Sequence, residues 1–272
     1  MKCLAKYLRQ YTSLWRRDNL SLSLEQPLPD AATQQLLKLY WSKDADRRWT
    51  GPLSSYPQLF VKTVRFDTLP SMLRATFGLR RAHGEFDWPI AELINTLEAA
   101  QRRVPVPKVL GFGVRRNRWR LTRQIMLLTQ TLSDYVDGKQ WLADPRCELD
   151  IFVSAMLRLV VELNEQGVYH LDLWLGNVML DPQNPGRLKA IDLENAYVGE
   201  VGNLARVLGF QFGHLYLREI NELMPESRYD ELVEALLPSV RGLDRGLFDQ
   251  YYRLCKHHHY SRKGRRQLAM KN

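Results

Sequence analysis

Residues 169–181, YHLDLWLGNVMLD, place two polar side chains in a narrowly defined local setting. Asp172 and Asn177 stand five residues apart, after an apolar helical pattern at 150–166 and before an apolar strand-like pattern at 188–198. Apolar residues at helical spacing predict a packed helix, and a short apolar run predicts a buried strand. The chain must therefore turn from helix to strand here, and the turn presents a carboxylate and a carboxamide.

A second carboxylate follows at the end of the next apolar run, where Asp192 lies fifteen residues after Asn177. Carboxylate and amide oxygens are ligands that Mg²⁺ accepts, and the ion keeps its remaining positions for water and phosphate oxygens. Phosphoryl transfer requires a group that accepts the hydroxyl proton, a metal on the nucleotide phosphates and a cation that holds them. The spacing therefore favours phosphoryl transfer, with Asp172 as the proton acceptor.

The first half of the chain mixes strand-like and helical patterns. Residues 59–66, LFVKTVRF, predict a strand around Lys62. Residues 90–103 predict a helix, and residues 104–114, VPVPKVLGFGV, predict an extended segment because proline disfavours helix in the residue before it. Residues 118–132 add further strand material. These patterns predict a strand-rich part of the protein with one main helix.

Charge is distributed unevenly along the 272 residues, although the net charge is +9. Residues 1–132 carry 22 Lys and Arg against 10 Asp and Glu, whereas residues 133–250 carry 10 against 20. Residues 251–272 carry seven basic residues and no acidic one. A basic half, an acidic half and a basic tail indicate two lobes and an anionic partner.

We therefore expect three segments: an N-terminal helical extension at 1–40, a strand-rich lobe at 41–131 and a helix-rich lobe with a basic tail at 132–272. Within the extension, apolar residues recur at helical steps and predict a helix over residues 1–20. That helix either packs on the body of the protein or lies in a membrane interface, with Tyr11 and Trp15 as anchors.

Other patterns limit the class of protein. The sequence has no apolar run long enough to span a bilayer and no secretory signal pattern at its start. Its three cysteines are far apart, without the spacing of a metal site, and suit a reducing compartment. We therefore expect a cytoplasmic protein.

The motifs resemble those of a known family. The segment HLDLWLGN fits the kinase catalytic-loop pattern H-x-D-x-x-x-x-N, and IDLE at 191–194 occupies the place of the metal-binding D-F-G. Lys62 and Glu92, followed by VPVP, stand where related small-molecule kinases carry a paired lysine and glutamate. Together with the basic segment LRATFGLRRA, this order resembles the lipopolysaccharide kinase family, which phosphorylates heptose or Kdo in the inner core of lipopolysaccharide.

The resemblance implies an α+β, bilobal protein-kinase-like fold with a strand-rich N-lobe and a shortened helical C-lobe. It also implies ATP-dependent phosphorylation of a sugar hydroxyl, at the inner face of the inner membrane. Asp172 would be the catalytic residue, and Asn177 and Asp192 would hold Mg²⁺. Lys62, steadied by Glu92, would hold the phosphates of ATP. Backbone groups of four residues would contact adenine: Thr129, Gln130, Thr131 and Leu132.

Three departures from the kinase patterns leave alternatives open. Leu171 replaces the arginine of the protein-kinase H-R-D motif, and Leu193 replaces the phenylalanine of D-F-G, so a protein substrate is disfavoured. Gly51 is the only glycine before Lys62, where protein kinases carry a glycine-rich loop. The chain is therefore a sugar kinase, a kinase of another small molecule, or a catalytically silent kinase-like module that binds a membrane or a protein.

Several polar residues have both a functional and a structural interpretation. Glu194 is either a third cation ligand or a surface charge. The run CKHHHY at 255–260 is interpreted as a surface run, because adjacent histidines on a helix point in different directions. His170 is interpreted as a buried structural residue. The basic tail lacks the aromatic residues of a nucleic-acid module, which makes anionic lipid headgroups or core-sugar phosphates its expected partner.

Overall fold

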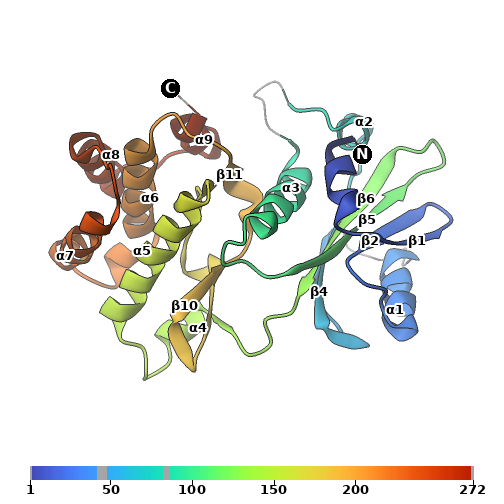
Figure 1. Cartoon of the computed structure of the whole chain (residues 1–272), viewed down its shortest axis with the longest axis horizontal. Coiled ribbons are helices and arrows are strands. Elements are labelled where there is room, and N and C mark those ends of the chain that lie inside the picture. The colour runs from blue at the N-terminus through green and yellow to red at the C-terminus, as the bar shows by residue number, and fades with distance from the viewer. Residues whose placement is uncertain (1, 42–47, 82–85, 271–272) are drawn as a thin grey trace. The chain divides into compact units, whose positions relative to one another are not determined.

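The computed structural model describes residues 2–41, 48–81 and 86–270. The chain forms two compact units. The first contains Met1–Ala100 and Pro107–Ser133, and the second contains Gln101–Val106 and Asp134–Asn272. Strands dominate the first unit and helices the second, as Figure 1 shows. The predicted α+β class is thereby confirmed, with each type of element concentrated in its own unit.

A six-stranded antiparallel sheet forms the centre of the first unit, with the order β1-β2-β5-β6-β4-β3. The strands are β1 Ser13–Arg17, β2 Leu20–Leu24, β3 Arg48–Leu53, β4 Tyr56–Arg65, β5 Val109–Arg116 and β6 Thr122–Gln130. Side chains alternate between the two faces of a strand. In β4, Leu59 and Val61 therefore pack into one apolar cluster, whereas Val64 packs into another.

Helices cover both faces of this sheet. Helix α1, Asp30–Trp41, packs Ala32 and Leu36 on the face that carries Leu59 and Val61. The opposite face is covered by the 3-10 helix η1, by α2 and by α3. Their bounds are Lys2–Arg9, Leu69–Phe77 and Trp88–Gln101 (Figure 1). Because β4 is covered on both faces, a lysine at its centre requires an acidic partner from a covering helix.

The N-terminal region differs from the expected helix over residues 1–20. Helical structure is confined to η1, and the chain then forms the hairpin β1–β2, which extends the sheet beside β5. Tyr11 is buried against Phe112, with ring centroids 5.6 Å apart, and Trp15 packs against the cluster beneath α1. The two residues considered as membrane anchors are therefore part of the packed unit.

The second unit contains two small sheets and a group of helices. One sheet has the order β10-β9-β7 and the other pairs β11 with β8. The strands are β7 Val136–Asp137, β8 Val168–His170, β9 Val178–Asp181, β10 Asn184–Ala190 and β11 Ala196–Val198. The 3-10 helix η2, Leu175–Asn177, leads into β9, and η3, Leu193–Asn195, leads into β11.

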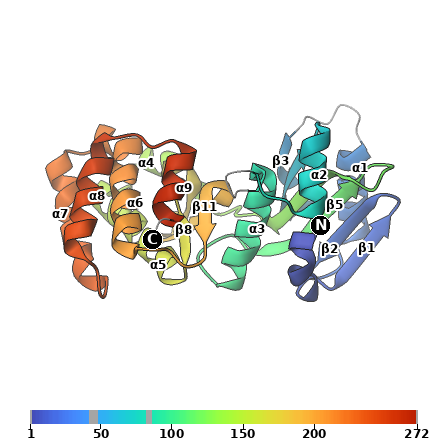
Figure 2. The ribbon, with the colours of Figure 1, turned by 90° about the horizontal axis from the view of Figure 1, so that it is seen from above.

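Six α-helices complete the described part of this unit (Figures 1 and 2). They are α4 Gly138–Leu142, α5 Leu149–Glu165, α6 Leu204–Arg218, α7 Glu226–Leu236, α8 Arg245–His257 and α9 Arg262–Met270. Helix α6 packs closely against α8. Gly209 permits this approach, since a Cβ atom there would lie only 2.5 Å from the carbonyl oxygen of Phe248. Pro225 stands at the N-cap position of α7.

The structure also bears on three sequence expectations, which concern a membrane-spanning segment, the run at 255–260 and the basic tail. Among the described residues, no helix combines the length and the apolar character needed to cross a bilayer. His257, His258 and His259 are exposed, in agreement with a surface run, whereas Cys255 and Lys256 of the same run are buried. The basic tail, in contrast, forms the helix α9, which lies beside α6 in Figure 2 and contributes Ala269 and Leu268 to an apolar cluster.

Candidate active site

Two short ladders in the second unit hold the segment that contains Asp172. Strand β8 pairs with β11, so that His170 lies opposite Ala196, and β9 pairs with β10 directly after η2. The loop at 171–177 and the loop at 191–195 therefore lie next to each other, although the chain makes a full hairpin between them. This arrangement collects the polar residues of both loops in one place.

The Asp172 carboxylate is held at both oxygens. Oδ2 accepts a hydrogen bond from Asn195 Nδ2 at 3.0 Å, and Oδ1 accepts one from Arg265 Nη1 and lies 3.5 Å from His214 Nε2. Burial alone would raise the pKa of Asp172, but the contacts with His214 and Arg265 and the charges of Arg265 and Arg218 outweigh it and hold this pKa well below its ordinary value. Asp172 is therefore ionised and fixed in orientation.

His170 supports this loop from below. Its Nε2 atom lies 3.0 Å from the carbonyl oxygen of Ile191, and its Nδ1 atom accepts from the backbone N–H of Asp172 at 3.4 Å. Burial lowers the pKa of His170, and the side chain is 1% exposed. The ring is thus neutral, donates through Nε2 and ties the two loops together, which is the structural role expected of it.

Asn177 and Asp192 stand at neighbouring points of the two loops. Asn177 Nδ2 donates to the carbonyl of Asp172 at 3.1 Å, which leaves the Oδ1 atom for another contact. The backbone N–H of Ile191 donates to the carbonyl of Asn177 at 2.9 Å, so the residue after Ile191 begins beside Asn177. Asp192 has φ 60° and ψ 59°, a left-handed conformation that costs a non-glycine residue about 1–2 kcal/mol. The surrounding ladders hold this conformation in place.

Glu194 faces the C-terminal helix. Its carboxylate lies 3.7 Å from Arg262 Nη1, and its backbone carbonyl accepts from Arg262 Nη2 at 3.1 Å. Glu194 is partly exposed. These contacts give Glu194 a structural partner in α9, and its use as a cation ligand stays a prediction.

Lys62 and Glu92 form an ion pair in the first unit. Lys62 lies in the middle of β4, opposite Leu127 of β6 and Thr50 of β3, and its Nζ atom binds Glu92 Oε1 of helix α3. The side chains are 19% and 7% exposed. A buried carboxylate requires such a partner, because an unpaired charge in an apolar setting is strongly unfavourable. The pairing expected between the two residues is present.

Residues 129–132 form the end of β6 and the segment after it. The backbone N–H of Gln130 donates to the carbonyl of Lys108, and the N–H of Thr131 donates to the carbonyl of Gln58, both at 2.8 Å. These two donors are therefore used within the first unit. The expectation that this segment contacts adenine stays a prediction. Such a contact would now use the carbonyl groups of the segment and the backbone N–H of Leu132.

Gly51 does not lie in a loop. It occupies the middle of strand β3, opposite Val61 of β4, and a Cβ atom there would make only ordinary contacts with the Trp49 ring. The turn of this hairpin is formed by Ser54 and Ser55. Gly51 therefore does not act as part of a phosphate-binding glycine loop in the described part of the chain.

Three residues at Asp172 were not expected from the sequence: Asn195, His214 and Arg265. Asn195 directly follows the IDLE run, and this position was only a weak indication that it belongs to the site. His214 lies in α6, where its ring stacks on Phe210 with centroids 5.3 Å apart. Arg265 belongs to a tail whose composition indicated only a positive charge. The contact between Arg265 and Asp172 spans 93 residues, and no local pattern could have identified it.

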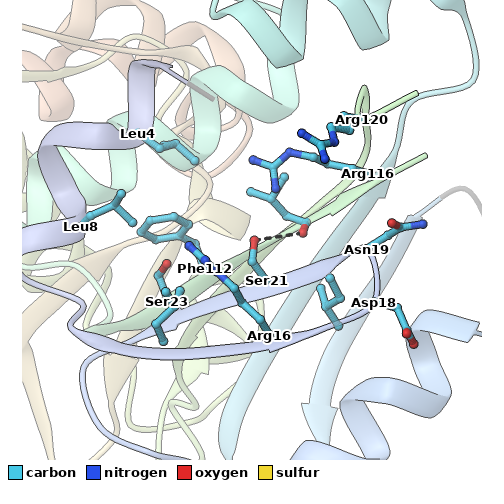
Figure 3. A pocket seen from close by; sticks show the side chains of 13 residues that line it. Leu4, Leu8, Arg16, Asp18, Asn19, Ser21, Ser23, Phe112, Arg116 and Arg120 are labelled. Carbon is cyan, nitrogen blue, oxygen red and sulfur yellow. Dashed lines mark hydrogen bonds between the residues drawn. The ribbon is translucent and has the colours of Figure 1, made fainter. Parts of the chain in front are cut away.

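A cavity of about 570 Å³ lies elsewhere in the first unit, between η1 and the strands β1, β2 and β5. Figure 3 shows Leu4 and Leu8 of η1 on one side of it and Arg116 and Arg120 on the other. Leu8 and Leu14 are each 48% exposed. Arg16, Arg116 and Arg120 line this cavity together with one acidic residue, Asp18, so its wall combines apolar surface with an excess of positive charge.

Comparisons with known proteins place the chain in a family. The model of the lipopolysaccharide kinase (Kdo/WaaP) family matches residues 54–208. No curated protein matches the chain in sequence. Among solved structures, WaaP in complex with acyl carrier protein is 17% identical with a TM-score of 0.46, and the match covers 79% of this chain and 86% of that one.

Two structures of WbdD are also similar. The bifunctional kinase-methyltransferase WbdD is 17% identical with a TM-score of 0.46, and the match covers 76% of this chain and 42% of that one. A second WbdD structure is 16% identical with a TM-score of 0.48, and the match covers 82% of this chain and 47% of that one. The chain thus spans less than half the length of the WbdD chains.

The match to the family model extends over more than half of the sequence and includes the strand of Lys62 as well as the loops of Asp172 and Asp192. The resemblance noted in the motifs is thereby confirmed over both units. The protein belongs to the lipopolysaccharide kinase (Kdo/WaaP) family.

Proposed function

We propose that this protein transfers the γ-phosphoryl group of ATP to a hydroxyl group of a lipopolysaccharide inner-core sugar, heptose or Kdo. Family membership supports a kinase of lipopolysaccharide. The observation that carries the reaction is the arrangement of Asp172, Asn177 and Asp192, which two adjacent loops bring to one place. The reaction would take place at the cytoplasmic face of the inner membrane.

The donor set fits Mg²⁺. Asn177 offers an amide oxygen because its Nδ2 atom is already committed to the carbonyl of Asp172, and Asp192 offers a carboxylate from the neighbouring loop. Both are hard oxygen ligands of the kind that Mg²⁺ takes, and two protein ligands leave positions for phosphate oxygens. Bound there, Mg²⁺ would supply neutralisation of the phosphate charge. Asn177 and Asp192 are therefore the residues that would hold it.

Asp172 would orient the acceptor hydroxyl and accept its proton. Oδ1 is occupied by Arg265, while Oδ2 has one hydrogen bond, from Asn195, and can accept another. A carboxylate with a low pKa is a weak base. In a loose phosphoryl-transfer transition state, however, positioning of the nucleophile contributes more than strong basicity. The fixed orientation of Asp172 suits this role.

Lys62 would bind the α- and β-phosphates of ATP. The ammonium group of Lys62 has three N–H donors, and its contact with Glu92 fixes its position in the first unit. Residues 129–132 would contact adenine through their remaining backbone groups. ATP binding would therefore depend on the Lys62–Glu92 pair more than on a glycine-rich loop.

The activity is tested with purified protein, magnesium, radiolabelled ATP and dephosphorylated lipopolysaccharide core oligosaccharide. The wild-type protein should label the sugar, and Asp172→Ala should reduce the rate about 10²–10⁴-fold, because general base and positioning contributions of this size are lost. Asp172→Asn keeps the shape without the charge and should be similarly impaired. Label on another small molecule in an acceptor panel, with none on the core sugar, would contradict the proposed acceptor.

We further propose that the protein contacts an anionic phospholipid surface through the cavity of Figure 3. The wall supplies three arginines, Arg16, Arg116 and Arg120, for headgroup phosphates, and the exposed Leu8 and Leu14 supply apolar contact. Each basic residue near such a surface contributes on the order of 1 kcal/mol. A membrane interface was one of two alternatives for a helix over residues 1–20, and in this proposal the contact is made by the face formed by η1 and the hairpin β1–β2.

Vesicle co-sedimentation tests this contact with matched variants. Arg16→Glu should reduce binding to vesicles of phosphatidylglycerol and phosphatidylethanolamine at least fivefold, since a favourable charge becomes an unfavourable one. Arg17→Glu changes the charge equally at the next residue, which does not line the cavity, and should have the smaller effect. Equal losses in the two variants would contradict the cavity as the docking site.

One observation favours a second candidate, a catalytically silent kinase-like module. Gly51 lies within a strand, so the described segment before Lys62 offers no glycine turn to the phosphates. A silent module would retain the fold and the vesicle binding but would not transfer phosphate. Nucleotide binding separates the two candidates.

A further inference from the structure

The C-terminal helix α9 carries a basic face against the loops of the active site. Arg265 binds Asp172 Oδ1, Arg262 contacts the carbonyl and carboxylate of Glu194, and the Arg266 guanidinium lies 5.8 Å from the centre of the Tyr197 ring. The three arginines stand at helical spacing and contact two separate segments of the chain, Asp172 in one loop and residues 194–197 in and after the other. A helix that only displayed charge to solvent would not bury one of them against a carboxylate.

Arg265 is fixed by more than this one contact. Arg265 is only 9% exposed, and its Nη1 atom also lies 3.1 Å from His214 Nε2. His214 Nε2 lies close to both Arg265 Nη1 and Asp172 Oδ1, so the ring packs against the Arg265–Asp172 pair. The ring stacks on Phe210, which holds it in place. Arg265 therefore bridges a fixed ring and the carboxylate of Asp172.

Apolar packing seats the helix in the same register. Leu171, which precedes Asp172, is 2% exposed and belongs to a cluster with Phe210 of α6 and Ala269 of α9. Leu268 packs against this cluster. Leu171, the residue that departs from the H-R-D pattern, therefore belongs to the same apolar cluster as Ala269 of α9. The arginine that contacts Asp172 comes instead from α9, in another part of the chain.

We propose that Arg265 is a positioning residue of the phosphoryl transfer, which fixes the rotamer of Asp172 so that Oδ2 faces the acceptor hydroxyl. The proposal rests on the proposed function. With Oδ1 bound to Arg265 and Oδ2 bound to Asn195, the carboxylate plane is set from two sides, and the remaining lone pair of Oδ2 has a defined direction. The C-terminal helix is in this way an integral part of the active site.

Steady-state kinetics of matched variants test the proposal. Arg265→Met should lower kcat on the order of 10–100-fold, because small misplacements of a catalytic group have effects of this size, and should leave the KM for ATP within about twofold. Arg265→Lys keeps a donor and a charge and should regain part of kcat. Lys263→Met removes the same charge from an exposed position of α9 and should retain wild-type kcat. Unchanged kcat in Arg265→Met would overturn the proposal.

Chemical rescue separates positioning from mere packing. Arg265→Ala leaves space where a guanidinium group stood, and millimolar methylguanidinium should restore part of kcat in this variant. The same compound should not affect Lys263→Ala. The proposal fails if three results coincide. Arg265→Ala shows a normal thermal transition but is inactive, methylguanidinium does not restore its kcat, and Arg265→Lys regains no kcat. Arg265 would then act only through packing.

An NMR measurement that needs no catalytic turnover tests the role of Arg265 independently of the proposed activity. The side-chain amide of Asn195 donates to Asp172 Oδ2, so its nitrogen-15 NMR signal reports the orientation of the carboxylate. This signal, assigned by its loss in Asn195→Ser, should shift in Arg265→Met and stay in place in Lys263→Met. If wild-type protein labels no acceptor, the proposed function fails. A signal that does not move in Arg265→Met shows instead that Arg265 does not set the carboxylate.

Discussion

At the scale of single residues, the polar groups of each unit are joined by pairs whose loss should be measurable. Lys62→Met leaves Glu92 buried without its ammonium partner, and an unsatisfied buried group costs on the order of 1–3 kcal/mol. We expect urea denaturation to show a destabilisation of this size. The double variant Lys62→Met with Glu92→Gln should recover part of it, because the uncompensated charge is gone. Additive losses would contradict a direct coupling.

The buried His170 makes stability depend on pH. Its pKa in the folded state is lowered by burial from an ordinary value of 6.5, so between the two values the unfolded chain binds a proton that the folded chain does not. Stability is therefore retained above pH 6.5 and is lost as the pH falls below it. His170→Gln, which keeps an N–H donor for Ile191, should show a flatter decline in melting temperature from pH 7 to pH 5.

The residues of the site differ in how well the sequence could predict them. The spacing of Asp172, Asn177 and Asp192 is local, and short strands on either side place their loops next to each other, so the pattern was sufficient to predict their proximity. Their roles in catalysis and metal binding stay predictions. The contact of Lys62 with Glu92 followed from the family resemblance. Arg265 and His214 reach Asp172 from helices far along the chain, and such contacts depend on how α6 and α9 pack.

At the scale of elements, the junction between α5 and β8 should be sensitive to substitution. Gly167 has φ 66°, and a Cβ atom there would lie 2.6 Å from Arg102 Nη1 and 3.1 Å from the carbonyl of Gly199. Gly167→Ala should therefore destabilise the protein by about 1–2 kcal/mol, measured by urea denaturation. Gly186→Ala meets nothing within 4 Å and is a matched control that should have little effect. Equal effects would contradict a local conformational cause.

Elements with strong periodicity were predicted well, and the N-terminal region was not. Helix α5 agrees closely with the apolar pattern at 150–166, because that pattern extends over several turns. In residues 1–20 the apolar side chains recur at steps that suit a helix, yet they are shared between η1 and the strand β1. Pairing of the hairpin with β5 decides the outcome, and a short periodic pattern does not contain that information.

At the scale of the whole molecule, the response to nucleotide distinguishes an active kinase from a silent module. A ligand that binds only the folded state adds RT ln(1 + [L]/Kd), about 2.7 kcal/mol at a hundredfold excess over Kd. ATP with magnesium should therefore raise the melting temperature of the wild-type protein, and Lys62→Met should weaken the shift. A flat response in the wild-type protein would favour the silent module.

The position of the hairpin β1–β2 also bears on whether separate copies of the chain associate. Without it, β5 would be the outermost strand, and its largely apolar residues would offer unpaired backbone groups to any other exposed strand. The strand that does lie outermost carries Arg16 and Arg17, and charge at such a border discourages strand addition. Removal of residues 1–24 should therefore yield aggregates in light scattering, so the hairpin contributes to colloidal stability as well as to the fold.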